Sequence, residues 1–264
     1  MTSGRDAAAP PSPGVQAVLF DLFDTLVLFE RDRLPEVSVN GRTIRSTAGH
    51  LHEALSPFAP QVALGDFVNA LGWSWQEAER VRSATHREVA APARFETLFR
   101  HLGVEPSALP PETIPTLLAT HMRELSKAVV FPPHHRRLLE ALRRRHRLAV
   151  VSNFDYTPTA RFVLERAGVV DLFETIVVSD EVGWRKPAPV IFERALTRLA
   201  VSPDQALFVG DRADLDVAGA QSVGMRAVWI NRGGEALPAG ARPPEFEIRD
   251  LGELAGILGA DGDG

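Results

Sequence analysis

The sequence predicts an α/β protein in which a doubly wound parallel sheet carries an inserted α-helical domain. Three observations lead to this fold class. Four apolar runs each end at, or shortly before, a polar residue; strand-like and helix-like patterns alternate from residue 133 onward; and residues 28–131 read as helices separated by prolines. Repeated strand–helix units imply parallel pairing. The polar residues at the strand ends are therefore expected to meet in one crevice.

The composition excludes several classes of protein. The 264 residues are 45% hydrophobic and 24% charged, which is ordinary for a globular chain with a full core. A net charge of −5 gives no electrostatic basis for nucleic-acid binding, and no apolar run approaches a membrane span. The absence of cysteine rules out disulfides and thiolate metal sites and fits a reducing compartment. We therefore expect a cytoplasmic protein with no nucleic-acid or membrane partner.

Short apolar runs and helical periodicity define the predicted core. The run 15–20 is almost entirely apolar, as expected of a strand that is covered on both faces. Leucines recur on one helical face in residues 134–145, and Pro158 suits the first turn of a helix that ends near Gly168. The other predicted strands are 148–152, 175–179, 206–210 and 227–230, and the other helices are 189–200 and a segment that ends near Gly224.

The segment 28–131 follows a different pattern and is predicted to be a cap over the crevice. Its helix-like stretches are 63–71, 75–90, 94–104 and 114–129, and Asn40-Gly41 within residues 37–44 predicts a hairpin with a type I′ turn. Such a cap would exclude water and select the substrate. We therefore divide the chain into a disordered leader (1–14, without the apolar stretch of a signal peptide), a core (15–27 and 132–258) and the cap.

Asp21 and Thr25 are the first candidate site residues. Asp21 directly follows the first strand, and a carboxylate in that place can attack phosphorus and form an aspartyl-phosphate, which divides a difficult hydrolysis into two easier steps. The spacing of Asp21 and Thr25 alone carries little weight, because a loop aspartate and a capping threonine would look the same. Its value depends on the partners further along the chain.

A second acidic group follows the strand 206–210. Asp211 and Asp216 lie on either side of Asp214 across a strand-to-helix turn. Hard carboxylate oxygens close to a phosphate suit Mg²⁺, which takes one or two carboxylates together with water and substrate oxygens. Helix capping could explain Asp214 or Asp216. It does not explain Asp211 directly after an apolar strand, so a metal site is the favoured interpretation.

Two further groups complete the predicted site. Ser152 and Asn153 follow the strand 148–152 and offer a hydroxyl and backbone N–H groups to an anion, although helix capping is an equal alternative on this pattern alone. Lys186 precedes Pro187 at a strand-to-helix junction, where an ammonium group can balance carboxylates and phosphate together. The chain has only one other lysine, Lys127, so a solvated loop lysine is the weaker interpretation.

These motifs resemble those of haloacid dehalogenase superfamily hydrolases with a helical cap inserted after the first motif. They occur in the order DLFDT, SN, KP and GDRADLD. The resemblance covers about residues 15–258 and implies a Rossmann-like core. It also implies that Asp21 is the nucleophile, that Thr25 and Ser152 contact the phosphoryl group and that Lys186 stabilises the developing negative charge, while Asn153 flanks the site.

The same resemblance implies a magnesium site and reveals one departure from the family pattern. Mg²⁺ would be held by Asp21, Asp211 and the backbone carbonyl of Phe23, with Asp216 in support. Phosphatases of this family usually carry a general acid where this chain has Phe23, and general acid–base catalysis contributes roughly 10²–10⁴-fold. A replacement by Asp24 would have to act from a different direction.

Three classes of function follow from this departure. The first is a Mg²⁺-dependent phosphatase of a small phosphorylated metabolite whose leaving group needs little protonation, and this class is favoured. The second is a 2-haloacid dehalogenase, because a halide leaves without a proton; Asp211 and Asp216 would then crowd the Asp21 carboxylate without a compensating cation. The third is a non-catalytic protein of the same fold that binds a ligand or a partner.

The remaining features receive structural interpretations. His50 and His52 are expected at a polar helix start rather than in a metal site, and Trp73 and Trp75 are expected to pack rather than to line a substrate surface. Asp155 is expected to cap the helix that follows it. One group of arginines is expected to form a solvated basic face: Arg143, Arg144, Arg145 and Arg147. In a second group, one member is expected to contact a substrate anion: Arg31, Arg33, Arg42 and Arg45.

Overall fold

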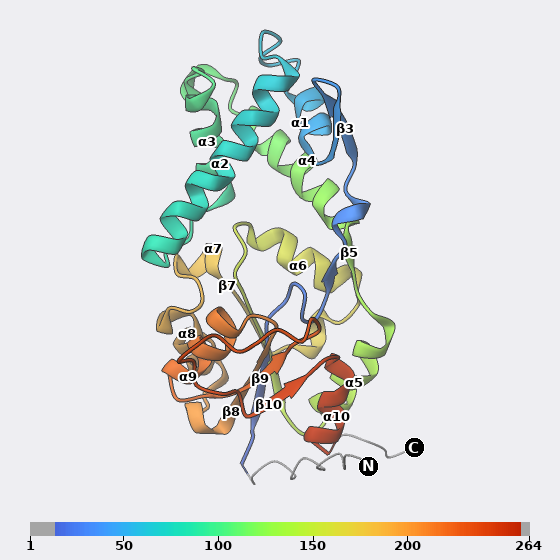
Figure 1. Cartoon of the computed structure of the whole chain (residues 1–264), viewed down its shortest axis with the longest axis vertical. Helices are drawn as coiled ribbons and strands as arrows, with labels where there is room; N and C mark the ends of the chain where they lie inside the picture. Colours follow the sequence, from blue (N-terminus) through green and yellow to red (C-terminus); the bar gives the residue numbers. More distant parts are fainter. Residues whose placement is uncertain (1–13, 260–264) are drawn as a thin grey trace.

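The core of the protein is a six-stranded sheet in which each neighbouring pair is parallel (Figure 1). The structure is a computed structural model and describes residues 14–259, so the predicted leader lies outside the described residues except for Gly14. The strand order is β10-β9-β8-β1-β6-β7. The strands are β1 (Ala17–Phe20), β6 (Arg147–Ser152), β7 (Thr175–Val178), β8 (Ala206–Gly210), β9 (Arg226–Ile230) and β10 (Phe246–Ile248).

Helices cover both faces of this sheet, which confirms the predicted doubly wound α/β fold. Along β1, Val18 and Phe20 pack into one apolar cluster, and Ala17 and Leu19 pack into another on the opposite face. The first cluster contains residues of α5 (Pro133–Arg143), α6 (Thr157–Arg166) and α10 (Leu254–Ile257), and the second contains residues of α8 (Pro189–Leu199) and α9 (Ala218–Ser222). Burial on both sides explains why β1 is apolar at every position.

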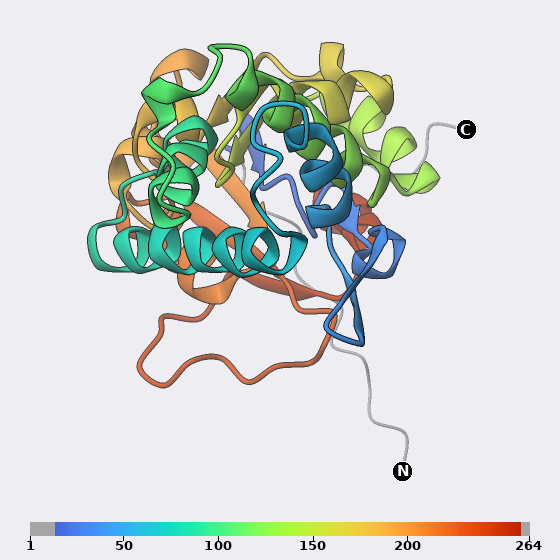
Figure 2. The same ribbon diagram turned by 90° about the horizontal axis from the view of Figure 1, so that it is seen from above.

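Two parts of the core differ from the sequence prediction. The edge strand β10 was not predicted, because three residues are too few for an apolar pattern; it follows the long loop 231–245 that projects from the core in Figure 2. The predicted helix before Gly224 is divided into a π-helical turn, Ala213–Val217, and the short α9. Gly224 adopts a φ of 85°, so the chain turns there as expected of a glycine C-cap.

Residues 28–131 form a largely helical unit on one end of the core (Figure 1). Its helices are α1 (Ala48–Leu55), α2 (Leu64–Thr85), α3 (Ala91–His101) and α4 (Thr113–Lys127). They enclose an apolar cluster of their own, which includes Leu51, Phe67 and Phe95. The chain passes between this unit and the core along a short antiparallel pair, β2 (Leu28–Phe29) and β5 (Val129–Val130).

The local predictions within this unit were partly correct. The hairpin is confirmed as β3 (Glu36–Val39) paired with β4 (Arg42–Arg45), with positive φ at Asn40 and Gly41. The prediction of two helices over 63–71 and 75–90 was wrong, since α2 runs unbroken through its 22 residues. It ends at Thr85 because His86 adopts a left-handed conformation with φ 54°, and residues 87–90 are not helical.

The remaining elements are short helical turns. They are α7 (Ser179–Val182) and the 3₁₀ turns Arg31–Arg33, Pro106–Ala108, Val170–Leu172, Pro203–Gln205 and Leu251–Glu253. Within residues 14–259, no helix has both the length and the apolar composition that crossing a membrane would require.

Candidate active site

Three carboxylates meet at the carboxyl ends of the central strands β1 and β8. Asp21 follows β1 and Asp211 follows β8, and the Asp21 N–H donates to the carbonyl of Val209 at 2.9 Å, so the two strand ends lie side by side. Asp216 comes from the π-helical turn after β8. One oxygen from each of these carboxylates lies within 4.8 Å of the others. The structure therefore brings together the acids that the sequence had placed almost 200 residues apart.

Gly210 makes room for this arrangement. A Cβ atom at Gly210 would collide with the carboxylate of Asp216. Asp216 is itself fixed, because the backbone N–H of Arg212 donates to its Oδ2 at 2.9 Å. The glycine before Asp211 is thus a packing requirement of the site, which a reading of strand ends alone did not reveal.

Lys186 is the cation that faces this acidic group. Its Nζ lies 2.5 Å from Oδ1 of Asp21 and 2.7 Å from Oδ1 of Asp216, and the side chain is buried. Asn153 holds the backbone of Lys186 on both sides: its Nδ2 donates to the Lys186 carbonyl at 3.0 Å, and its Oδ1 accepts from the Lys186 N–H at 2.7 Å. Asn153 therefore positions the lysine rather than facing the carboxylates directly.

Two hydroxyl groups complete the arrangement. Thr25 is fully buried and its Oγ1 donates to Oδ1 of Asp211 over 3.4 Å. Ser152 ends β6, and its Oγ is buried without a hydrogen-bond partner in the protein. A buried hydroxyl without a partner is costly unless a ligand or water completes its hydrogen bonds. Ser152 is accordingly suited to contact an oxygen-rich ligand.

Burial and mutual repulsion raise the proton affinity of the acids. Burial raises the pKa of Asp21 to about 8, with Asp216 and Asp211 adding to the rise and Lys186 opposing it. Burial and the neighbouring Asp216 raise the pKa of Asp211 to about 6. Burial lowers the pKa of Lys186, but the carboxylates of Asp21 and Asp216 outweigh it, so the pKa lies above its usual value. One ammonium thus faces more negative charge than it can balance.

The position of the usual general acid is occupied by an aromatic packing contact. The rings of Phe23 and Phe154 lie 4.8 Å apart between centroids. The neighbouring Asp24 is already engaged, because its Oδ1 accepts from the Phe29 N–H at 3.0 Å. Asp24 also adopts a left-handed backbone with φ 56°. Phe23 has no carboxyl group, and the Asp24 carboxylate already has a backbone partner, so neither residue replaces the general acid.

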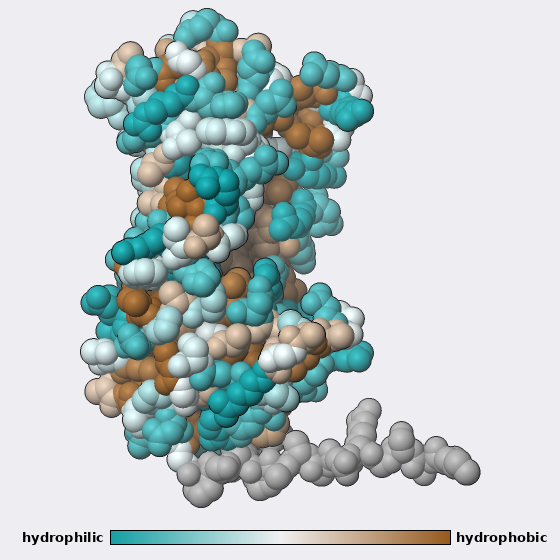
Figure 3. Space-filling model, turned by 60° about the vertical axis from the view of Figure 1, so that its left-hand side comes forward, coloured by the Kyte–Doolittle hydropathy of each residue, from teal (hydrophilic) through white to brown (hydrophobic). Residues whose placement is uncertain are grey.

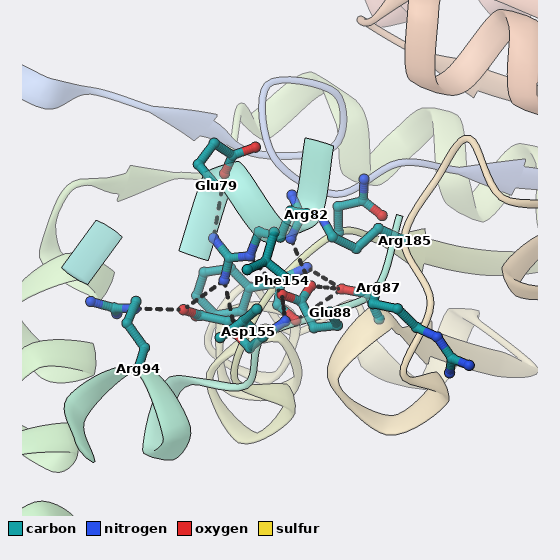
Figure 4. A network of polar contacts seen from close by, with 12 residues as sticks. Glu79, Arg82, Arg87, Glu88, Arg94, Phe154, Asp155 and Arg185 are labelled. Carbon is teal, nitrogen blue, oxygen red and sulfur yellow. Dashed lines mark hydrogen bonds and ion pairs between the residues drawn. The ribbon is translucent and has the colours of Figure 1, made fainter. Parts of the chain in front are cut away.

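A buried ion network lies between the helical unit and the core, and the sequence analysis did not predict it (Figure 4). Oδ2 of Asp155 accepts from Arg82 at 3.3 Å and from Arg94 at 3.2 Å. Asp155 does not cap α6 as expected; Asp180 does so instead, accepting from the Thr157 N–H at 2.9 Å. The physical reason is that a carboxylate at this boundary gains more from two buried guanidinium groups than from one amide.

Glu88 extends this network to the loop that carries Lys186. Its carboxylate accepts from Arg82 at 2.9 Å, from Arg185 at 2.6 Å and from the hydroxyl of Ser179 (Figure 4). The backbone joins the same two loops, because the Glu88 N–H donates to the Gly183 carbonyl at 3.1 Å. A sign of the network was present in the sequence, since Arg82 continues the buried stripe of Ser74 and Ala78 along α2.

The histidines and tryptophans of the helical unit follow the sequence interpretation in part. His50 contacts Glu124, and His52 contacts the carbonyl of Val62 at 2.7 Å; neither joins a cluster of metal-ligating groups among residues 14–259. Trp73 stacks on His101 but is 37% exposed, which agrees with packing only in part. Trp75 is more exposed, at 51%, and lines a cavity between the helical unit and the core.

The arginine groups follow the sequence interpretation in part. Arg143, Arg144 and Arg145 are exposed, and Arg147 contacts Glu174 at 2.7 Å, as expected of a solvated basic run. In the second group, Arg33 contacts Glu30 and Arg42 is exposed on the hairpin. Arg31 and Arg45 line the same cavity as Trp75.

A family model for haloacid dehalogenase-like hydrolases matches residues 15–224, which is most of the chain. The chain belongs to this family. It is therefore a hydrolase, and the resemblance inferred from the motifs is confirmed. The carboxylate cluster, Lys186 and the strand ends that carry them all lie within the matched residues.

Relatives within the family include named phosphatases. The chain is 33% identical over 204 residues to a phosphoserine phosphatase of Thermus thermophilus, covering 75% of this chain and 78% of that protein. It is 29% identical over 220 residues to a glyceraldehyde 3-phosphate phosphatase of Methanopyrus kandleri, covering 83% and 85%.

Solved structures with the same fold include enzymes of both chemistries. A 2-haloacid dehalogenase from Pseudomonas syringae is similar with a TM-score of 0.69 and 25% identity, covering 93% of this chain and 98% of that one. A phosphatase of the family from Thermococcus onnurineus is similar with a TM-score of 0.62 and 28% identity, with the same coverage. The shared fold alone does not distinguish the two reactions.

Proposed function

We propose that the protein is a Mg²⁺-dependent phosphatase that hydrolyses the phosphate ester of a small molecule through an aspartyl-phosphate at Asp21. The observation that carries this proposal is the convergence of Asp21, Asp211 and Asp216 within 4.8 Å beside a single lysine. Such a concentration of buried acid suits a cation-assisted reaction on an anionic substrate. The similarity to relatives named as phosphatases supports the same reaction.

The donor set of the site fits a magnesium ion. Carboxylate oxygens are the ligands that Mg²⁺ prefers in proteins, and it commonly uses one or two of them with water and phosphate oxygens. Asp21, Asp211 and the backbone carbonyl of Phe23 would hold the ion, and Asp216 would support them. When bound, the ion would polarise the phosphoryl oxygens and offset the charge that gathers on them.

The protein's own residues would perform the following steps. Thr25, Ser152 and Lys186 would hold the phosphoryl group, with Lys186 stabilising its growing negative charge. The carboxylate of Asp21 would attack phosphorus, and the bond between phosphorus and the ester oxygen would break with its electron pair leaving on that oxygen. Water would then attack the aspartyl-phosphate and release inorganic phosphate. The departing oxygen would receive no proton from position 23.

Residues 28–131 would act as the cap of this enzyme, above the core formed by residues 15–27 and 132–258. The unit is joined to the core by the β2–β5 strand pair and meets it again through Glu88 and Asp155. A cap held in this way would limit access of water to the reacting phosphoryl group. It would also supply the residues that contact the departing part of the substrate.

A substrate panel tests the proposed function. We expect Mg²⁺-dependent hydrolysis of p-nitrophenyl phosphate and acetyl phosphate, whose leaving groups need little protonation, and slower hydrolysis of sugar phosphates. Release of phosphate, followed with and without a chelator, is the measurement. Failure to hydrolyse any of these compounds in folded, Mg²⁺-loaded protein would exclude the proposal.

The second candidate is a 2-haloacid dehalogenase. Phe23 in place of the acid and the similarity to the Pseudomonas syringae enzyme are the observations that favour it. Chloride release from 2-chloropropionate without a metal would support this candidate over the phosphatase. Inactivity in both assays would instead favour a non-catalytic protein that binds a ligand or partner.

The raised pKa values of the acids give a test of metal binding that does not depend on activity. Because the folded-state pKa is about 8 for Asp21 and about 6 for Asp211, the metal-free protein should lose stability as pH rises from about 4 to about 8. Mg²⁺ requires the deprotonated acids, so it should raise the melting temperature more at about pH 8 than at about pH 5. At roughly 100 times its dissociation constant, the stabilisation at the higher pH should be about 2.7 kcal/mol.

Thermal unfolding with and without Mg²⁺ at both pH values measures this effect. The Asp211→Asn variant serves as the control, and its Mg²⁺ increment should be much smaller. An increment that is the same at the two pH values in the parent protein would contradict binding at these carboxylates.

A further inference from the structure

A cavity of about 550 Å³ lies between the helical unit and the core. Figure 3 shows the molecule hollowed between its two parts, with apolar residues in the recess. The core contributes Phe23 and Phe154 to its lining, and α2 contributes Val68, Leu71 and Trp75. A pocket of this size is sufficient for a small organic ligand.

Two residues that line the cavity, Phe23 and Phe154, are close in sequence to the candidate active site. Phe23 is two residues beyond Asp21, and Phe154 is two residues beyond Ser152, so both rings follow directly on residues of the candidate active site. A substrate whose phosphoryl group faces Asp21 would extend past these rings. Its remaining part would then meet the apolar side chains of α2.

Trp75 is placed to contact a flat group in this cavity. It is a large aromatic residue with 51% of its surface exposed, and it lines a cavity whose surface is mostly but not entirely apolar. The guanidinium groups of Arg82 and Arg94 lie over its ring at 5.1 Å and 5.7 Å from the centroid. These cation–π contacts with the two guanidinium groups stabilise the position of the indole ring.

Several polar groups of the cavity already have partners within the protein, whereas the exposed Arg31 side chain has no hydrogen-bond or ion-pair partner among the described residues. Thr47 Oγ1 lies 2.8 Å from Nδ1 of His121, and Arg94 donates to Asp155. Burial and the nearby Arg94 lower the pKa of His121 to about 3, so its ring is neutral and cannot donate a proton as an acid. The Asp24 carboxylate accepts from the backbone. A sugar with many hydroxyl groups would therefore find few partners here.

We propose that the substrate is an aryl phosphate, the phosphate ester of a bulky phenol, and that Trp75 selects its aromatic ring. This inference rests on the proposed phosphatase activity. In the first step, Asp21 displaces the aryl oxygen, which leaves as a phenolate and takes its proton from water. Water then cleaves the aspartyl-phosphate to inorganic phosphate and the free carboxylate.

The missing acid and the apolar cavity point to the same leaving group. A phenol has a pKa of about 10, as in tyrosine, whereas water has a value of about 15.7, and alkyl alcohols resemble water in this respect. A phenolate can therefore leave without the proton that Phe23 is unable to supply. The rings of Phe23, Phe154 and Trp75 provide an apolar and aromatic surface for the phenol.

The test compares 1-naphthyl phosphate, phenyl phosphate and acetyl phosphate in the parent, Trp75→Ala and Trp73→Ala proteins. The second ring should raise kcat/KM for the naphthyl ester about tenfold or more over the phenyl ester. Trp75→Ala should remove most of this preference and affect acetyl phosphate much less, because acetyl phosphate has no ring to contact Trp75. Trp73, which stacks on His101 outside the cavity, is a matched control, and its variant should behave like the parent.

Binding of 1-naphthol, measured by calorimetry, gives a readout that does not require catalysis. We expect binding to the parent protein that weakens about tenfold in Trp75→Ala. Hydrolysis of acetyl phosphate with no preference for the naphthyl ester, or an equal loss for all three substrates in Trp75→Ala, would overturn the aryl assignment. Failure of the proposed phosphatase function would give a different result: the protein would bind 1-naphthol but hydrolyse none of the three phosphate compounds.

Discussion

The Asp21→Asn variant is expected to lose phosphatase activity by a factor on the order of 10⁴ or more, with its fold intact. The amide is a poor nucleophile, and removal of a single member of a covalent catalytic unit typically abolishes most of the rate. The buried side chain retains its size, so the loss would reflect chemistry rather than packing. Phosphate release from p-nitrophenyl phosphate, together with the melting temperature, is the appropriate pair of measurements.

Asp214→Asn is a matched control for this experiment. The same change is made on the loop beside the site, but Asp214 is 54% exposed and pairs only with Arg212 at 2.9 Å. Its variant should keep activity within a small factor of the parent. If Asp21→Asn hydrolysed the substrate as fast as the parent does, a covalent intermediate at Asp21 would be excluded.

Removal of the Glu88 carboxylate is expected to destabilise the protein strongly. Glu88→Ala would leave the guanidinium groups of Arg82 and Arg185 without a shared partner in a site where the carboxylate is only 1% exposed. Breaking a buried ion pair from one side typically costs about 3–5 kcal/mol of unfolding free energy, because the remaining charge stays buried. This is a large part of the roughly 5–15 kcal/mol that stabilises a typical domain.

Glu96→Ala on α3 provides the comparison, since Glu96 pairs with Arg100 at 3.0 Å on the surface. A pair of that kind contributes about 0.3–0.5 kcal/mol. Urea unfolding of both variants gives the two values. Equal shifts in the unfolding midpoint would mean that the buried network adds no stability of its own.

The positions of the candidate site residues could be predicted from the sequence because they depend on strand ends. Asp21 and Asp211 each follow an apolar run, and parallel pairing of β1 with β8 brings such positions together. This rule requires no knowledge of the side chains in between. It also identified Lys186, although the role of Asn153 as the group that holds its backbone became clear only from the structure.

The boundary between the two parts of the molecule could not be predicted in the same way. Asp155 was interpreted from its neighbours in sequence as a helix cap, whereas its partners Arg82 and Arg94 lie more than 60 residues away. Local patterns do not show which distant charges will share a buried position. The same limitation applies to Trp75, whose exposure depends on a cavity formed by two separate parts of the chain.

The single helix α2 and the strand β10 illustrate two limits on predicting elements. The stretches 63–71 and 75–90 were interpreted as separate helices, but packing of α2 against α1 and α3 stabilises one unbroken helix. The strand β10 contributes only three residues at the edge of the sheet, and it is held by pairing with β9 rather than by a pattern of its own.

Ion pairs of Glu88 and Asp155 join the helical unit to the core. Any widening of the recess that separates α2 and α3 from the core must pull Arg82 and Arg94 away from Asp155, and Glu88 away from Arg185. Dissolved ions would compensate the separated charges only once water had reached them. If the recess opens to release a product of the proposed reaction, we expect the rate of release to rise with salt concentration, because dissolved ions stabilise the separated charges only in the open state.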